Sequence, residues 1–95
     1  MHFLHTCQPL LVYAPVATTG RSNSARALAA LLRKLREETG MRQVDLAEAL
    51  GEPQSFVSRF ESGERRLDVL ELRAVCRALK LSLDEFIRRF EEEVP

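Results

Sequence analysis

Residues 43–63 read QVDLAEALGEPQSFVSRFESG and contain the most informative pattern of this sequence. Its apolar pattern predicts two short helices, one that ends at Gly51 and one that begins at Pro53. Two helices joined by so tight a turn cross at a steep angle, so the first helix needs a small residue at the crossing. Ala47 meets this need, and Gly51 supplies the backbone freedom of the turn. The stretch therefore predicts a pair of crossed helices.

Six scaffold residues of this pair occur at fixed offsets. Counted from Gln43 as the first position, they fill positions 4, 5, 8, 9, 15 and 18. Each of them alone is an ordinary core or turn residue of a small helical protein. Their joint spacing is what indicates a helix-turn-helix. The six residues are Leu46, Ala47, Leu50, Gly51, Val57 and Phe60.

Helical patterns continue on both sides of the pair. Four leucines within residues 28–35 follow the i, i+3, i+4, i+7 rule and predict a helix over about residues 25–39. A D-x-x-E sequence at 68–71 and an S-x-x-E sequence at 82–85 have the spacing of capping boxes that open two further helices. Five helices with short connections and no strand pattern between them predict an all-α, five-helix domain over residues 24–95.

Residues 1–23 differ in character from the rest of the chain. They contain no Asp, Glu, Lys or Arg before Arg21, and we expect them to form an N-terminal arm that is extended or disordered. Residues 10–14 allow an alternative, because this β-branched and aromatic run could pair as a strand with another chain.

Length and composition indicate one soluble globular domain, with 95 residues of which 45% are hydrophobic and 29% are charged. The formal net charge is zero, which by itself argues against a nucleic-acid partner. The charges are uneven, however. Residues 21–66 contain nine Lys and Arg against seven Asp and Glu, whereas residues 67–95 contain five against seven. The basic excess therefore lies with the helix pair.

The cysteines and histidines predict neither a metal centre nor a disulfide framework. Cys7 and Cys76 form no CxxC motif, which fits a reducing cytosol. His2 and His5 lie near Cys7, but no fourth ligand accompanies them, so we expect no metal and no cofactor. Cys76 lies on an apolar helical stripe, where a thiol behaves as a small hydrophobic group.

Enzyme and membrane functions are also disfavoured. No Ser-His-Asp set, carboxylate pair or phosphate-binding loop is recognisable, so we expect no enzyme activity. The apolar run at residues 9–17 is too short to span a bilayer and follows no Lys or Arg. We therefore expect a cytoplasmic protein without membrane contact.

The sequence resembles the lambda-repressor-like family, the Cro and phage-repressor (XRE-like) type of helix-turn-helix. The resemblance rests on QVDLAEALG at 43–51, SRFESG at 58–63 and KLSLDEF at 80–86, and it covers about residues 28–90. It implies a sequence-specific DNA-binding transcription regulator, a repressor, that binds double-stranded DNA as a homodimer on a pseudo-palindromic operator.

The resemblance also implies which residues contact bases. Gln54 and Ser55 match the first base-reading positions, Arg59 matches a further one, and Ser58 lies on the same face. Arginine pairs with guanine and glutamine with adenine, so we expect a G·C preference under Arg59 and an A·T preference under Gln54. Gln43 matches a position whose side chain and amide contact a phosphate.

Three arginines are expected at the DNA backbone. Arg42 precedes the second helix, and Arg65 and Arg66 lie in the loop that this family places along the phosphates. Exposed arginines are common on protein surfaces, so a merely solvated cationic face is the alternative for these three and for Arg59.

Arg36 and Glu61 match a buried ion pair that joins the first and third helices of phage repressors, so we assign them to structure.

Two residues depart from the family pattern. Arg42 replaces the usual Ser or Thr N-cap, so the cap hydrogen bond should be absent and only partly offset by Asp45. Glu52 occupies a turn position that is normally apolar.

The last helix carries more apolar surface than a bundle of this size needs. Phe86, Ile87 and Phe90 are therefore expected at a dimer interface.

Two other functions share the fold and stay open at this point. One is an antitoxin bound to a toxin protein, and the other is a protein-interaction adaptor without DNA binding.

Overall fold

This computed structural model describes residues 21–93. These residues contain five α-helices and no strand. The predicted all-α fold is thus confirmed. The strand alternative at residues 10–14, the candidate ligands before residue 8 and most of the predicted arm lie outside the described residues. None of the helices within 21–93 combines the length and apolar composition of a membrane span. The helices are α2 (Arg21–Glu38), α3 (Gln43–Leu50), α4 (Gln54–Glu61), α5 (Val69–Ala78) and α6 (Leu83–Glu93).

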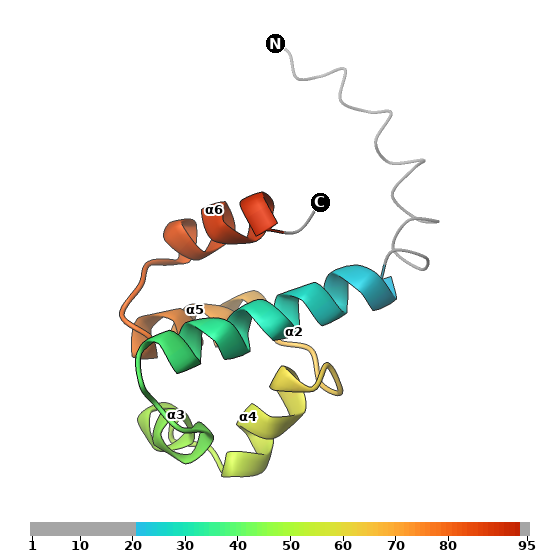
Figure 1. Cartoon of the computed structure of the whole chain (residues 1–95). Coiled ribbons are helices and arrows are strands. Elements are labelled where there is room, and N and C mark those ends of the chain that lie inside the picture. The colour runs from blue at the N-terminus through green and yellow to red at the C-terminus, as the bar shows by residue number, and fades with distance from the viewer. Residues whose placement is uncertain (1–20, 94–95) are drawn as a thin grey trace, which may run out of the picture.

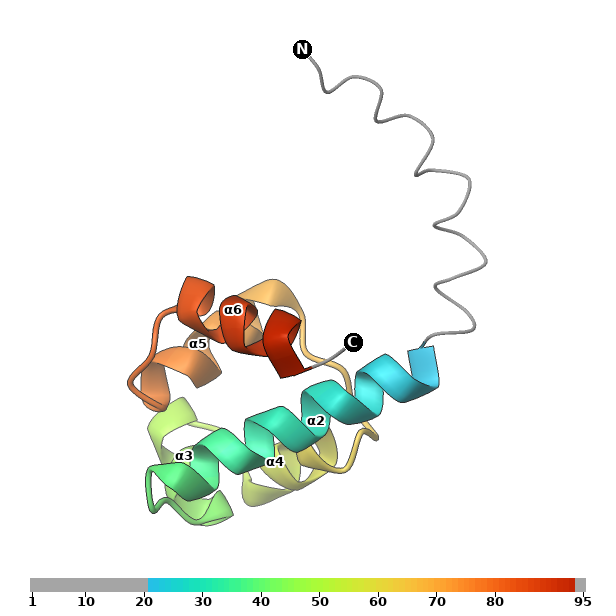
Figure 2. The ribbon, with the colours of Figure 1, turned by 45° about the horizontal axis from the view of Figure 1, so that its top comes forward.

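The long helix α2 runs through the middle of the bundle, with α3 and α4 on one side and α6 on the other (Figure 1). Figure 2 shows α6 lying along α2. Two ion pairs, Lys34 with Glu93 at 3.2 Å and Glu38 with Arg89 at 3.7 Å, require the two helices to run antiparallel. Each large apolar side chain buried in the core contributes about 1.5–3 kcal/mol to stability. The core comprises Leu31, Leu32, Leu35, Leu46, Ala47, Val57, Phe60, Val75, Cys76, Leu79 and Phe86.

The first helix begins earlier than predicted. The sequence assigned residues 21–23 to the arm and started the helix near residue 25, whereas α2 begins at Arg21. The Ala- and Leu-rich stretch that follows nucleates the helix, and adding one more turn is then inexpensive because each residue brings its own hydrogen bond. Ser and Asn lower helix propensity by well under about 1 kcal/mol each, so they do not prevent this extension.

The turn between α3 and α4 has the left-handed glycine that the sequence predicted. Gly51 has φ 70° and ψ 30°, in the left-handed region, and the Glu52 amide donates to the carbonyl of Ala47 at 3.0 Å. Pro53 was predicted as the first helical residue, but its ψ of 157° makes it the N-cap residue of α4. Its carbonyl still accepts the first helical hydrogen bond, from Phe56 at 2.9 Å.

Both predicted capping boxes are present. The Glu71 amide donates to Asp68 Oδ1 at 2.7 Å, and the Asp68 amide donates to Glu71 Oε1 at 3.0 Å. Ser82 and Glu85 exchange equivalent bonds at 3.2 Å. These bonds satisfy amides that have no partner within the helix and fix where α5 and α6 begin.

The prediction that Phe86 lies at a dimer surface is wrong. Phe86 is 1% exposed and belongs to the core, whereas Ile87 is 43% exposed and Phe90 is half-buried. The rings of Phe86 and Phe90 stack with centroids 6.4 Å apart. Periodicity identified the apolar face of α6 correctly, but most of that face covers this chain's own core.

Replacing Phe86 by Ala should lower the free energy of unfolding by about 3–5 kcal/mol, because it leaves a cavity in the core. Ile87→Ala is the matched control and should cost about 1 kcal/mol or less, because this side chain is already largely hydrated. Urea denaturation at a protein concentration where the chain is monomeric measures both. Equal losses for the two variants would contradict the placement of α6.

Candidate nucleic-acid interface

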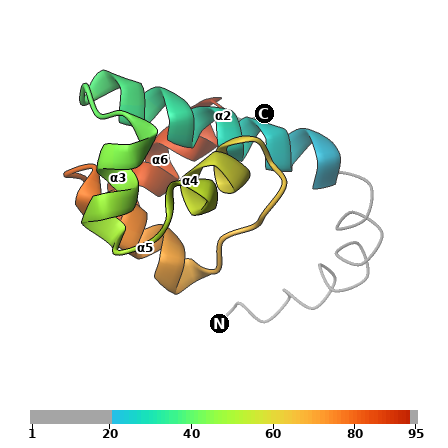
Figure 3. The ribbon, with the colours of Figure 1, turned by 90° about the horizontal axis from the view of Figure 1, so that it is seen from below.

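One side of α4 is polar and open to solvent. Gln54, Ser55, Ser58 and Arg59 are all exposed and follow helical spacing, so they form a single stripe that we call the α4 polar face. The opposite side of the helix carries Val57, Phe60 and Glu61, which are buried. Figure 3, which views the bundle from the side of α3 and α4, shows these two helices in front of α2 and α6. The three residues predicted to read bases, Gln54, Ser55 and Arg59, thus lie together with Ser58 on an accessible surface.

Beneath this face, Arg36 of α2 and Glu61 of α4 form a bidentate ion pair. Arg36 Nε donates to Glu61 Oε2 at 2.6 Å, and Nη2 donates to Oε1 at 3.0 Å. The side chains are only 9% and 3% exposed. A third bond, from Arg36 Nη1 to the carbonyl of Met41 at 2.8 Å, fixes the guanidinium to the connection between α2 and α3. The hydrogen bond to Glu61 is the main reason why the pKa of Arg36 lies above its ordinary value.

The ion pair continues to the surface through two glutamines. Gln43 Nε2 donates to Glu61 Oε1 at 3.0 Å, and Gln54 Nε2 donates to Gln43 Oε1 at 3.3 Å. A carboxylate only accepts hydrogen bonds, so Glu61 determines which end of the Gln43 amide points inward. Gln43 in turn orients Gln54. The buried charge pair therefore sets the orientation of a side chain on the α4 polar face.

This chain of bonds leaves Gln54 with a defined hydrogen-bonding capacity. After one N–H donates to Gln43, the amide retains one N–H donor and its carbonyl acceptor. The major-groove edge of adenine presents N7 as an acceptor and the N6 amino group as a donor. The free donor and acceptor of Gln54 match that edge.

Arg42 and Asp45 form the start of α3. No side-chain cap bond is present at Arg42, as its departure from the family pattern predicted. Instead Asp45 accepts from the Arg42 amide at 2.8 Å and from its guanidinium at 2.9 and 3.1 Å. The guanidinium bond, followed by the amide bond, holds the pKa of Asp45 below its usual range. Arg42 is 77% exposed, but its charge is partly neutralised by this carboxylate.

Arg65 lies differently from the expected phosphate contact. Its guanidinium donates to both carboxylate oxygens of Glu71, at 3.1 and 2.9 Å, and also to the carbonyl of Arg66 at 3.1 Å. It stacks 4.7 Å from the ring centre of Phe56. This pairing is the main reason why the pKa of Glu71 is lowered. The geometry gives Arg65 a structural role, which is to hold the loop between α4 and α5.

Two exposed cations remain at this side of the bundle. Within the described ranges, Arg59 and Arg66 enter no ion pair, and both residues are exposed. The sequence predicted both arginines as DNA contacts. It did not predict the Gln43–Gln54 bond or the pairing of Arg65 with Glu71. The first depends on how α3 and α4 cross, and the second depends on the path of a loop. Neither leaves a periodic signal in the sequence.

Replacing Glu61 by Gln should lower the free energy of unfolding by about 3–5 kcal/mol, because Arg36 would then be a buried charge without a counter-charge. The NMR signals of the Gln43 and Gln54 side-chain amides should shift as well, because they are oriented through Glu61. Thermal or urea denaturation and a side-chain amide spectrum provide the two measurements.

Glu64→Gln is the matched control, since Glu64 is exposed and its side chain lies in the loop after α4. It should change stability by no more than about 0.5 kcal/mol. An unchanged unfolding midpoint for Glu61→Gln would show that the ion pair does not stabilise the two helices.

Comparisons with known proteins agree with the fold. A family model described as helix-turn-helix matches residues 32–86. The clp gene regulator ClgR from C. glutamicum has a similar structure, with a TM-score of 0.68 and 28% identity over 76% of this chain and 92% of that chain. The restriction-modification controller protein C.Esp1396I, as a tetramer in complex with its natural 35 base-pair operator, has a TM-score of 0.70 and 25% identity over 75% and 93%.

A comparison with curated proteins gave no match. The family model spans more than half of the chain and includes both α3 and α4. The fold, the motif and both structural neighbours agree on one assignment. The chain belongs to the lambda-repressor-like helix-turn-helix family.

Proposed function

We propose that this chain is a sequence-specific DNA-binding transcription regulator whose α4 enters the major groove. The observation that carries the proposal is the α4 polar face, on which the Gln43–Glu61 chain of hydrogen bonds presents Gln54 with a free donor and acceptor. A helix fits the major groove of B-DNA, and base edges are read there by such side chains. Gln54, Ser55 and Arg59 are the base-reading residues in this proposal, with Ser58 beside them.

The backbone contacts follow from the cations that the structure leaves available. Arg66 lies in the loop next to α4 and is exposed, so it is proposed to contact a phosphate. The N-terminal amides of α3, with Gln43 and Arg42, provide a second anion-binding position. Arg65 is not included, because Glu71, the Arg66 carbonyl and the Phe56 ring all hold its guanidinium. Arg42 differs, because its side chain is 77% exposed and Asp45 neutralises it only in part.

A homodimer on a pseudo-palindromic operator is the proposed active form, with half-sites one helical turn, about 34 Å, apart. Few cations are available on one copy, so two linked copies would supply affinity that one lacks. The similar controller protein binds its operator as a tetramer, which is compatible with this form. Ile87, with 43% exposure, is the α6 residue most suited to the contact, and Phe90 borders it. We further propose that the chain acts as a repressor, that it is cytoplasmic and that it has no catalytic activity.

A protein partner is the second candidate, and a specific surface favours it. Val69 and Leu70, in the first turn of α5, are 67% and 73% exposed. Leu70 borders a groove between α3 and α5 that also contains Arg73 and Arg77. Exposed adjacent apolar side chains of this kind mark protein contacts. An antitoxin or adaptor would use this surface, and the antitoxin would still bind DNA.

Selection from a random duplex pool should enrich an inverted repeat with a guanine under Arg59 in each half-site. Arg59→Ala should enrich the same repeat with that one position randomised, because a bidentate arginine–guanine pair discriminates by about 1–3 kcal/mol. Sequencing of the enriched pools provides the measurement.

The matched control is Arg88→Ala, an exposed arginine of α6 on the other side of α2, which should enrich the same repeat as the native chain. Failure of the native chain to enrich any sequence would reject sequence-specific DNA binding. A native-like guanine preference in Arg59→Ala would reject the assignment of that residue.

Replacing Arg66 by Gln should weaken binding to all duplexes alike. The slope of log affinity against log salt concentration should fall in magnitude by about one, because one phosphate contact is lost. Fluorescence anisotropy between low and high salt measures the slope, and Arg88→Gln should leave it unchanged. A native slope in Arg66→Gln would exclude this arginine from the phosphate contacts.

A further inference from the structure

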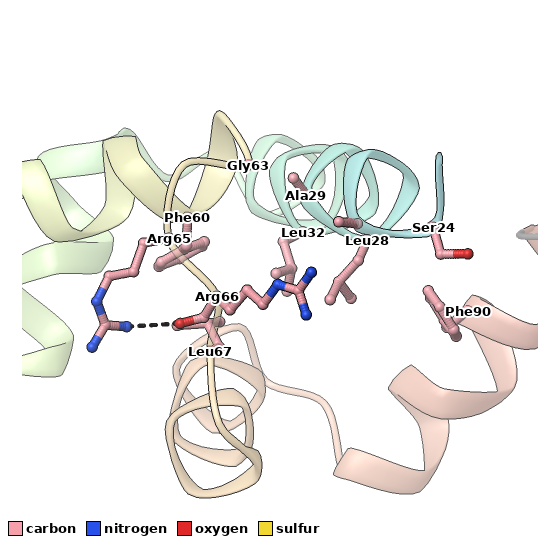
Figure 4. Close-up of a pocket in the computed structure, with 11 residues that line it drawn as sticks. Ser24, Leu28, Ala29, Leu32, Phe60, Gly63, Arg65, Arg66, Leu67 and Phe90 are labelled. Atoms are coloured by element: carbon pink, nitrogen blue, oxygen red, sulfur yellow. Dashed lines mark hydrogen bonds between the residues drawn. The ribbon is translucent and has the colours of Figure 1, made fainter. Parts of the chain in front are cut away.

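A pocket of about 270 Å³ opens where the first half of α2, the loop after α4 and the end of α6 meet (Figure 4). Its walls are mainly apolar and include Leu28, Leu32, Phe60, Leu67 and Phe90. Leu32 and Phe60 belong to the buried core, since each is only 2% exposed. The other three are half-buried, so an apolar ligand there would cover surface that is now partly hydrated.

One available cation lies at this pocket. Figure 4 shows the Arg66 guanidinium directed toward Leu28 and Leu32, whereas Arg65 points the other way. Arg65 is neutralised by Glu71, and its bond to the Arg66 carbonyl fixes the loop backbone. Arg66 pairs with no carboxylate of residues 21–93. Among the residues that the structure describes, the pocket therefore combines an apolar body with one unneutralised positive charge.

We propose that this pocket binds a small apolar monocarboxylate, such as a medium-chain fatty acid. A water molecule occupies about 30 Å³ in the liquid, so the pocket has room for a ligand of about ten non-hydrogen atoms. The carboxylate pairs with the planar guanidinium of Arg66 through two hydrogen bonds, and the hydrocarbon chain lies against Leu28, Leu67 and Phe90. Sugars and nucleotides are disfavoured, because Ser24 is the only uncharged polar side chain among the described residues of the lining.

The regulatory part of this inference rests on the proposed function. Arg66 is the proposed phosphate contact, and its side chain would have to turn out of the pocket to reach a DNA phosphate, so a bound carboxylate and the phosphate would compete for it. Ligand binding should therefore weaken DNA binding, by about fivefold or more. By linkage, DNA weakens ligand binding by the same factor.

The test for the site uses the full-length ¹⁵N-labelled protein without DNA and octanoate as the probe. Saturable amide shifts are expected at Leu28, Leu67 and Phe90. Octanol has the same chain without the charge, and acetate has the charge without the chain. Both should bind at least about tenfold more weakly, because each lacks one half of the interaction.

Two variants test the geometry. Arg66→Gln should weaken octanoate binding about tenfold, whereas Arg88→Gln, an exposed arginine outside the pocket, should not. Ala25→Phe fills the pocket from a half-buried position of α2 and leaves Arg66 intact. It should abolish binding while the amide spectrum elsewhere stays native.

Several outcomes would overturn the site. They are the absence of saturable shifts, octanol binding as tight as octanoate, and native binding by Arg66→Gln or by folded Ala25→Phe. Shifts of the same amides with protein concentration alone, with no effect of octanoate, would show an interface between copies instead and also overturn it.

The regulatory part is tested separately with a selected operator. Octanoate should lower the operator affinity of the native chain but not that of Arg66→Gln. Octanoate binding with unchanged operator affinity would overturn the regulatory part alone. Octanoate binding by a chain that binds no DNA would retain the site and reject the proposed function, and DNA binding without octanoate binding would do the reverse.

Discussion

The buried ion pair of Arg36 and Glu61 orients three neighbouring elements of this structure. Two charges removed from water are tolerated only when their remaining donors and acceptors are satisfied. Here Arg36 also donates to the Met41 carbonyl, and Glu61 also accepts from Gln43. Each additional bond fixes another element relative to the pair: the connection after α2, the start of α3 and, through Gln43, the first residue of α4. A hydrophobic pair of equal volume would hold the helices together without orienting any of these groups.

The structure also explains how a chain with zero net charge can present a cationic surface. Arg42 is partly neutralised by Asp45 of α3, and Arg65 is paired with Glu71 of α5. Arg59 and Arg66 retain their charge. Counting arginines along the sequence therefore overestimates the positive potential at this surface. The distribution of carboxylates around the arginines decides which of them can meet a phosphate.

Features that depend on local pattern were predictable from the sequence. The helices, the capping pairs at Asp68 and Ser82 and the glycine turn at Gly51 each involve residues within one or two turns of each other. The burial of Phe86 was not predictable in this way. Periodicity places it on the apolar face of α6, but only the packing of α6 against α5 and the rest of the core shows that the face is covered. The Gln43–Gln54 bond joins residues 11 positions apart in two helices, so it requires the crossing geometry itself.

Arg65 and Arg66 show why adjacent residues of one type can differ in role. Arg65 has three partners: the carboxylate of Glu71, the ring of Phe56 and the carbonyl of Arg66. An exposed ion pair alone contributes at most about 1 kcal/mol, but the bidentate geometry and the stacking add to it and select one side-chain conformation. The Arg66 carbonyl accepts from its neighbour's guanidinium, which fixes the backbone that carries Arg66, whereas the Arg66 side chain is exposed and enters no ion pair with residues 21–93. Arg65 thus supports the backbone of Arg66. A substitution of Arg65 would change the conformation of the loop, whereas a substitution of Arg66 would remove a surface charge.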